Sequence, residues 1–253
     1  MRKRTVIALT TLALMVALVS GAAAQTPAAA QTPASTLTVD EIVTKHLATK
    51  GGAEKWKTIQ SQTMTGVALA QGFELSMTAY AKRPNLSRQE LTIELPGQPA
   101  MKIVNLFDGA KAWMINPMTG SDAPQEMPGA ESATAKAQSD FDGALIDYKT
   151  KGFTVELQPA ATVAGKQAHH LKVTRKDLPT QHVYLDPDTF VELRITTEGA
   201  NASETDLSDY KAIDGIMVPH AIKISQGGAV QAELKILTVK FNTAIDDAMF
   251  KVK

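Results

Sequence analysis

The chain has 253 residues, of which 44% are hydrophobic and 21% are charged, and its 26 basic side chains balance 26 acidic ones. This composition is that of a globular protein and excludes a disordered or collagen-like chain. A net charge of zero disfavours a nucleic-acid binder, which needs surplus basic residues to neutralise phosphates. The lack of cysteine in the sequence excludes disulfides, thiol catalysis, thiolate metal sites and a lipid-modified N-terminal cysteine.

Residues 1–24 have the pattern of a secretory signal peptide. Residues 2–4 (Arg-Lys-Arg) form a positive start, residues 6–19 are mostly apolar, and residues 22–24 (Ala-Ala-Ala) form a small-residue cleavage site. The apolar run is short for a membrane anchor, because a spanning helix needs about 20 residues. We therefore expect cleavage after Ala24 and export to the periplasm, where no ATP or reduced nicotinamide is expected.

A flexible leader is predicted next, over residues 25–36, which are rich in Ala, Pro, Thr and Gln and have no apolar periodicity. The remaining residues, 37–253, are expected to form a single domain.

That domain is predicted to begin with a helix. Thr38 and Glu41 have the spacing of a capping box, and the glycine pair at 51–52 is a stop signal. Residues 53–59 have the pattern of one or two further helical turns, with Trp56 on the packing side.

From residue 62 onward, apolar and polar residues alternate. A period of two is typical of strands with one apolar face, and hence of an antiparallel sheet. Turn signals separate the expected strands, at residues 83–85, 108–109, 186–188, 198–201, 214–215 and 227–228. The runs between them predict about ten or eleven strands.

One segment interrupts this pattern. Residues 118–129 are loop-like, and residues 131–148 have an apolar stripe at helical spacing. Gly143 weakens this predicted helix by about 1 kcal/mol relative to Ala. The expected order is a helix, five strands, a long helical excursion and six strands, which is not a βαβ pattern.

The apolar face of such a sheet has two interpretations. A curled sheet with helices over its open side encloses a volume that is either a filled core or a lipid site. Methionine, which is frequent after the signal peptide, suits a surface that adapts to acyl chains and also suits gaps in a core. The residues predicted to line this volume are Phe73, Leu75, Met77, Met101, Ile103, Leu171, Val173, Val183, Leu185, Leu193 and Ile195.

Two segments carry a resemblance to a known family. They are residues 81–86 (AKRPNL) and residues 107–117 (FDGAKAWMINP). With the order of signal peptide, capped helix, hairpins, helical insert and hairpins, they resemble the LolA/LolB-like outer-membrane lipoprotein-sorting proteins. The likeness covers most of the mature chain in layout and only these short segments in detail. Ser87 and Arg88 stand where the carriers have an aromatic residue, which is a departure from the family.

The resemblance implies a mainly β fold with some α structure: a curved antiparallel sheet, or unclosed β-barrel, of about eleven strands under lid helices. It implies a periplasmic carrier that binds the acyl chains of lipoproteins or other lipids in a hydrophobic cavity, for transfer toward the outer membrane. Inner- and outer-membrane transfer proteins are the partners that it suggests. By motif position, Arg83 is the residue that contacts the lid and gates lipid exchange.

Motifs of catalysis and metal binding are missing from the sequence. It contains no His-Glu-x-x-His, EF-hand loop or G-x-S-x-G. His169 and His170 are adjacent and point to opposite faces of a strand. A cluster of His170, His182 and Asp186 across a hairpin is conceivable, but surface polar pairs are far commoner. We therefore expect no enzyme activity, no metal and no cofactor.

Two alternatives to a carrier stay open. One is a periplasmic lipid-sensing or protein-binding regulatory domain without transport activity, which would have a protein partner. The other is a structural β-domain whose interior is filled by its own side chains.

Overall fold

A computed structural model of the chain describes residues 36–176, 178–199 and 202–252. The predicted signal peptide, and all of the predicted leader except Thr36, lie outside the described residues. None of the helices in the described ranges is long and apolar enough to cross a membrane.

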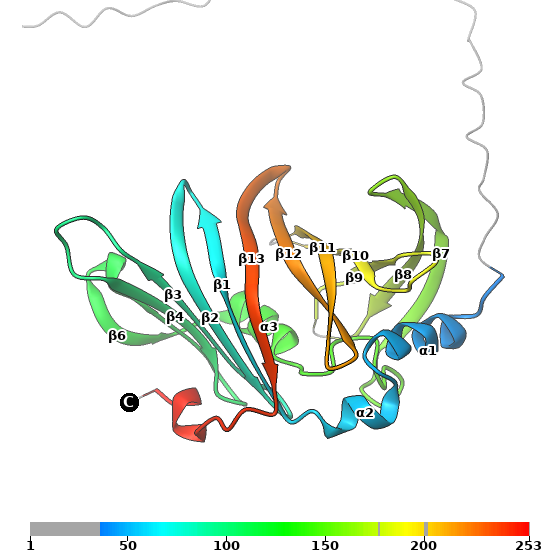
Figure 1. The fold of residues 1–253 in the computed structure, drawn as a ribbon, viewed down its shortest axis with the longest axis horizontal. Helices are drawn as coiled ribbons and strands as arrows, with labels where there is room; N and C mark the ends of the chain where they lie inside the picture. Colours follow the sequence, from blue (N-terminus) through cyan, green and yellow to red (C-terminus); the bar gives the residue numbers. More distant parts are fainter. Residues whose placement is uncertain (1–35, 177, 200–201, 253) are drawn as a thin grey trace, which may run out of the picture. The chain divides into compact units, whose positions relative to one another are not determined.

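The first half of the chain forms two short helices, six strands and a third helix (Figure 1). The helices are α1 (Val39–Thr49), α2 (Ala53–Thr58) and α3 (Gly129–Gln138). The strands are β1 (Ser61–Ala70), β2 (Phe73–Lys82), β3 (Leu86–Ile93), β4 (Met101–Phe107), β5 (Ala112–Asn116) and β6 (Ser121–Glu126). A 3₁₀ turn, η1 (Pro117–Thr119), separates β5 from β6.

The second half adds the remaining strands and a 3₁₀ turn, η2 (Asp247–Phe250). The strands are β7 (Thr154–Val163), β8 (Lys166–Thr174), β9 (Gln181–Leu185), β10 (Glu192–Thr197), β11 (Ser203–Ile213), β12 (Ile216–Gln226) and β13 (Ala229–Phe241).

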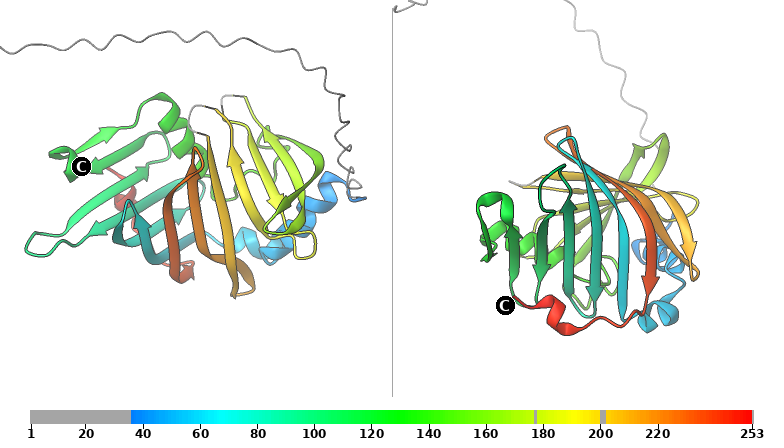
Figure 2. Two further views of the ribbon diagram at one scale, coloured as in Figure 1. Left: turned by 90° about the horizontal axis from the view of Figure 1, so that it is seen from above. Right: turned by 60° about the vertical axis from the view of Figure 1, so that its left-hand side comes forward.

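All 13 strands of the described residues belong to one antiparallel sheet, in the order β6-β5-β4-β3-β2-β1-β13-β12-β11-β10-β9-β8-β7. The chain therefore starts in the middle of the sheet, proceeds to one edge, passes to the opposite edge and returns to the middle. Residues 127–153, which include α3, make that passage and are called the crossing segment below. The sheet is curved, and its edge strands β6 and β7 do not pair to close it (Figure 2).

One face of the sheet is apolar and is covered, and we call it the inner face. Strand register aligns its residues: Met77 on β2 lies opposite Gly66 on β1, which lies opposite Ile236 on β13. Ile42 of α1 and Leu145 of the crossing segment pack on the inner face of β8 and β9. Helix α2 packs on the same face nearer the middle of the sheet, among buried residues of β2, β12 and β13.

The predicted helix start and stop are confirmed. The Thr38 side chain accepts a hydrogen bond from the Glu41 backbone N–H at 3.3 Å, and the Glu41 carboxylate accepts one from the Thr38 N–H at 2.7 Å. Gly51 and Gly52 follow α1 with φ of 84° and 87°, a conformation that glycine adopts without a steric penalty. Trp56 of α2 is buried, as expected.

The helix predicted over residues 131–148 is wrong from residue 139 onward. Helix α3 ends at Gln138, and turns follow. Asp140 accepts a hydrogen bond from the backbone N–H of Asp142 and so stabilises a local turn. Gly143 has a φ of 68°, which a right-handed helix cannot include.

The structure has 13 strands in its described residues, where the sequence predicted ten or eleven. Strand β6 lies inside the segment 118–129, which was predicted to be a loop because it contains Pro124. Strand β7 contains Pro159, and its register with β8 shifts between Gln158 and Ala161. Proline lacks a backbone donor, so it is tolerated in strands mainly at sheet edges, where both of these strands lie.

Replacement of Gly66 by Ala is expected to destabilise the junction between β1 and β13. The added Cβ would clash with the backbone carbonyl oxygen of Lys235 and lie 3.2 Å from the Cα of Ile236. We expect urea unfolding to show a loss of about 1–3 kcal/mol, typical of overpacking. Ser76→Ala, at an exposed strand position, is the control and should stay within about 0.5 kcal/mol. Equal effects of the two substitutions would contradict the close packing at Gly66.

Candidate functional site

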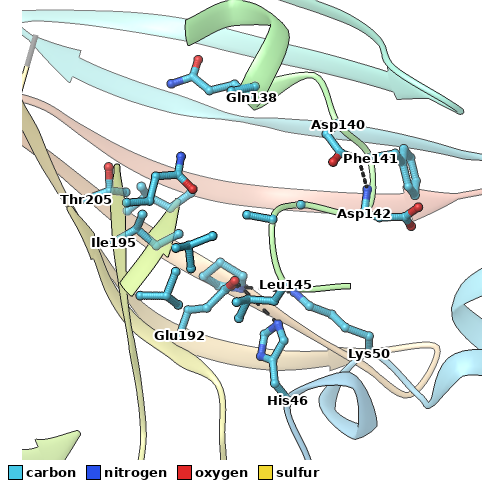
Figure 3. Close-up of a pocket in the computed structure, with 18 of the residues that line it drawn as sticks. His46, Lys50, Gln138, Asp140, Phe141, Asp142, Leu145, Glu192, Ile195 and Thr205 are labelled. Carbon is cyan, nitrogen blue, oxygen red and sulfur yellow. Dashed lines mark hydrogen bonds and ion pairs between the residues drawn. The ribbon is translucent and has the colours of Figure 1, made fainter. Parts of the chain in front are cut away.

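A cavity of about 420 Å³ lies between the inner face and the crossing segment (Figure 3). Its apolar wall comes from β8 to β12 on one side and from residues 141–145 on the other. The apolar lining residues are Trp56, Met64, Ala137, Phe141, Ala144, Leu145, Phe153, Val173, Leu178, Pro179, Val183, Ile195, Ile216, Met217, Val218, Pro219, Ile222 and Phe241.

One end of the cavity carries charged groups. Glu192 at the start of β10 lies 3.9 Å from the Lys50 ammonium and 3.7 Å from Nε2 of His46, measured to its carboxylate oxygens. The Nδ1 atom of His46 donates a hydrogen bond to the Phe190 carbonyl at 3.0 Å. Figure 3 shows these three side chains together at the end of the cavity next to α1.

Burial governs the protonation of this group. It lowers the pKa of His46, and this effect outweighs the nearby Glu192 charge, so the ring is neutral at pH 7. Burial would raise the pKa of Glu192, but the charge of Lys50 brings it below its usual value. The described charges at this end are therefore one carboxylate and one ammonium, which compensate each other.

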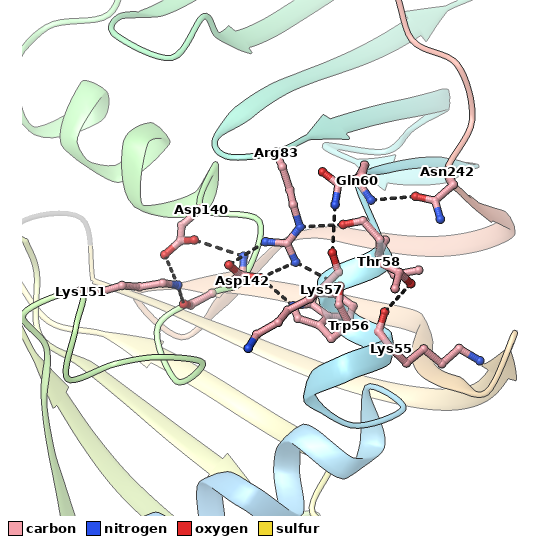
Figure 4. A network of polar contacts seen from close by, with 12 residues as sticks. Lys55, Trp56, Lys57, Thr58, Gln60, Arg83, Asp140, Asp142, Lys151 and Asn242 are labelled. Carbon is pink, nitrogen blue, oxygen red and sulfur yellow. Dashed lines mark hydrogen bonds and ion pairs between the residues drawn. The ribbon is translucent and has the colours of Figure 1, made fainter.

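Arg83 ties the crossing segment to α2 and to the end of β2 (Figure 4). Its Nε donates to the Ile59 carbonyl at 2.6 Å, and its Nη1 donates to Oδ2 of Asp142 at 2.7 Å. Trp56 completes the network, because its indole N–H donates to Oδ1 of Asp142 at 2.6 Å and its carbonyl accepts from Nη2 of Arg83 at 3.2 Å. The guanidinium also lies 4.7 Å from the ring centroid of Phe141.

The Asp142 carboxylate is held in its charged form. Burial would raise the pKa of Asp142, but the hydrogen bonds from Arg83 and Trp56 and the charge of Arg83 lower it below its usual value. This bidentate, partly buried pair is stronger than an exposed ion pair.

Further contacts fix the same part of the crossing segment. The Lys151 ammonium bonds the Asp140 carboxylate and the Gly143 carbonyl, both at 2.7 Å. The backbone N–H of Phe141 donates to the carbonyl of Pro84 at 3.4 Å. Residues 140–143 are therefore held at the rim of the cavity by polar contacts and not by helical structure.

Strand register places ten of the eleven predicted lining residues at inner-face positions, and Leu193 lies at the irregularity of β10 between Glu192 and Arg194, where it has no register partner. Met101 and Ile103 align through β3 with Met77, and Leu171 aligns through Val183 with Ile195. Three of the eleven line the cavity of about 420 Å³: Val173, Val183 and Ile195.

The other eight do not line this cavity. Leu171 and Leu185 are fully buried around Ile42 of α1. Met77 packs with Trp56, and Leu75 and Ile103 belong to a separate cluster on β1 to β4. Met101 and Leu193 are half-buried, and Phe73 is 47% exposed at the tip of a hairpin.

Two of the histidines considered for metal binding, His170 and His182, form a polar row on the outer face with Glu198. Nε2 of His170 and Nδ1 of His182 lie 2.8 Å apart, and Nε2 of His182 lies 2.7 Å from Glu198. Asp186 is not among them, because its carboxylate bonds Lys166 and the turn N–H groups that follow it. No group of three or more such side chains in the described residues could hold a metal ion.

Sequence reasoning missed Asp142, Glu192, His46 and Lys50. Asp142 lies within the predicted helix of residues 131–148, although Asp and Gly in residues 140–143 are a turn signal that could have indicated its position. The other three come together from α1 and β10, which are far apart in the chain, and no local pattern links them.

A curved antiparallel sheet that is not closed into a barrel defines the fold class, and solved structures share this fold. No protein-family model and no curated protein sequence matches the chain. A LolA superfamily protein from Nitrosomonas europaea has a TM-score of 0.57 and 14% identity, covering 85% of this chain and 98% of that one. A domain from Vibrio parahaemolyticus assigned to outer membrane lipoprotein sorting has a TM-score of 0.56 and 14% identity, covering 84% and 97%.

A DUF1329 family protein from Desulfovibrio piger is similar to the same degree, with a TM-score of 0.57, 14% identity and coverage of 84% and 97%. These likenesses establish a LolA-like fold for the chain. The resemblance seen in the sequence is thus confirmed at the level of the fold.

Replacement of Asp142 by Asn is expected to lower the free energy of unfolding by about 1–3 kcal/mol at pH 7, since it removes the charge that Arg83 and Trp56 stabilise. The pKa of Asp142 is lowered in the folded state, so its contribution is present above the ordinary Asp value of 3.8. It is lost as the pH falls below 3.8 through the lowered pKa.

Urea unfolding at pH 7 and at pH 3 measures this difference between wild type and variant. The control is Asp147→Asn, an exposed carboxylate in the same crossing segment. A difference that grows on acidification, or one that the control reproduces, would contradict the stabilising role of Asp142.

Proposed function

We propose that this protein is an exported carrier that binds acyl chains of lipoproteins or other lipids and passes them toward the outer membrane. The observation that carries the proposal is the inner-face cavity of about 420 Å³ under the crossing segment. Ligand pockets in proteins measure about 300–1,000 Å³, so this volume suits a single acyl chain or another small apolar ligand.

The charges around the cavity support an apolar occupant. Glu192 faces Lys50, Asp142 faces Arg83, and Asp140 faces Lys151. Because each of these carboxylates has a cationic neighbour, an uncharged chain can occupy the cavity without separating an ion pair. The apolar wall, with Met64 and Met217, adapts to chains of different length and branching.

Release of a bound chain requires an opening in the cover. Arg83 joins α2 to the crossing segment through Asp142, so the network of Arg83, Trp56 and Asp142 has to break when residues 140–145 move away. We propose that Arg83 gates the cavity in this way. Export by the predicted signal peptide would place the carrier between inner- and outer-membrane transfer partners.

Substitution of Ile195 by Trp tests the ligand site. Ile195 lines the cavity from β10, and an indole there would fill part of the volume. We expect affinity for a dansyl-labelled fatty acid, measured by fluorescence titration, to fall at least about tenfold. The control is Thr196→Trp, which alternates onto the outer face of the same strand and should leave binding unchanged.

Organic extraction and native mass spectrometry of the protein purified from its own envelope form the companion measurement. A co-purifying acylated species is the expected result. If wild-type protein binds none of the acyl ligands tested, the result would refute the carrier and indicate a filled core. Binding without transfer between donor and acceptor vesicles would refute the transport step and favour a lipid-sensing domain.

Substitution of Arg83 by Lys tests the gate. Lysine keeps the charge but cannot reproduce the forked donors that reach Asp142 and two carbonyls. We expect dissociation of the dansyl-labelled fatty acid to accelerate several-fold. Arg194→Lys, which alters a comparable pairing with Asp206 on the outer face, should leave the rate unchanged. An unchanged rate in the Arg83 variant would contradict the gate.

A further inference from the structure

A second cavity, of about 250 Å³, adjoins the first. It lies between the inner face of β1 to β4 and helix α3. Gln62, Met64 and Gln138 line both cavities, so the two volumes are neighbours across these side chains. Figure 3 places Gln138 at the end of the main cavity away from His46 and Lys50.

The second cavity exists because β2 carries small side chains there. Ala79 and Ala81 form its floor, at inner-face positions where Leu75 and Met77 stand earlier in the same strand. Alanine leaves space above the sheet that a larger apolar residue would fill.

The walls of this cavity are amides. Gln89 on β3 and Asn105 on β4 lie directly opposite each other in the sheet. Gln62 contributes a third amide, from β1, where it lies opposite Ala81. Inner-face positions of a covered sheet are usually apolar, so three amides in one patch are unusual there and can hydrogen-bond to an occupant of the cavity.

These amides have little protein to bond with. Gln89 donates a weak hydrogen bond, of 3.7 Å, to the sulfur of Met77. Within the described residues, no hydrogen bond involves the side chains of Gln62 or Asn105, and both are half-buried. Amide N–H donors and amide oxygen acceptors are therefore both available to a ligand.

No unpaired charge borders this cavity in the part of the chain that the structure describes. Arg88 is its charged lining residue, and its guanidinium bonds Glu90 at 2.7 Å and the Met249 carbonyl at 3.0 Å. A charged head would thus lose hydration without gaining a counter-ion, whereas an uncharged head would lose only hydrogen bonds that the amides replace.

We propose that the second cavity is a headgroup subsite for an amphiphile with an uncharged head rich in hydroxyl or amide groups. The acyl tail of this ligand lies in the main cavity, and its head bonds Gln62, Gln89 and Asn105. This inference rests on the proposed function, because it assigns the head of the ligand whose tail the carrier binds.

Competition with a dansyl-labelled fatty acid tests the subsite with three probes of equal chain length: 1-decanoylglycerol, methyl decanoate and decanoate. We expect the glycerol ester to bind wild-type protein about tenfold more tightly than the methyl ester, a factor that one or two net hydrogen bonds supply. Decanoate at pH 8 should bind more weakly than the glycerol ester, because no free cation meets its charge.

A double variant, Gln89→Leu with Asn105→Leu, should abolish the preference for the glycerol ester and leave methyl decanoate binding within about twofold. The control is Gln226→Leu, at an exposed strand end, which should keep the preference. An NMR measurement on wild type accompanies the double variant, because that measurement does not depend on the folding of a variant. Nuclear Overhauser contacts between the glyceryl protons and the side-chain amides of Gln89 and Asn105 are expected.

Each outcome separates the two proposals. Equal affinity of wild type for the glycerol and methyl esters, or glyceryl contacts away from these amides, would overturn the subsite and leave the carrier intact. Tighter binding of decanoate would overturn it as well. Absence of binding by all three probes would overturn the carrier and, with it, the subsite.

Discussion

A single curved sheet with one apolar face depends on a cover, and the strand order determines where that cover comes from. Because β6 and β7 are the two edges, the connection between them has to pass from one side of the sheet to the other. The crossing segment makes this passage along the inner face, where Leu145 and Ile146 pack with α1, α2 and the strands. The same connection that joins the two halves of the chain thus also shields the apolar surface from water.

The way in which the cover is attached distinguishes it from an ordinary core element. At residues 140–143, hydrogen bonds and ion pairs to Arg83, Trp56 and Lys151 hold the segment. Water can take over the hydrogen bonds of these groups when the segment moves, which limits the net cost of breaking them. The attachment of this segment above the cavity is the feature on which the proposed gate depends.

The sequence signals that proved dependable were local. The capping box at Thr38 and the glycine pair after α1 lie within one turn of the residues that they affect, and the structure has both. Alternation assigned eleven apolar residues to one face, and strand register gives ten of them one face, with Leu193 at an irregularity of β10. The signals failed where two local preferences competed: the apolar stripe of residues 131–148 suggested a helix, but Asp140 and Gly143 made a turn. Strand β6 was not predicted because it contains Pro124. Proline is tolerated in this strand because the strand lies at the edge of the sheet.

By itself, the sequence determined that the chain is mainly β, which residues face the same side of the sheet, and that catalytic and metal motifs are missing from it. These properties follow from periodicity and short spacings. Only the tertiary structure decided which inner-face residues border a cavity and which are core, because that depends on what packs above them. It also decided that Glu192 would meet His46 and Lys50, and that three amides of the inner face would line one pocket. Contacts between residues more than a hundred positions apart have no local signature, since chain topology alone brings them together.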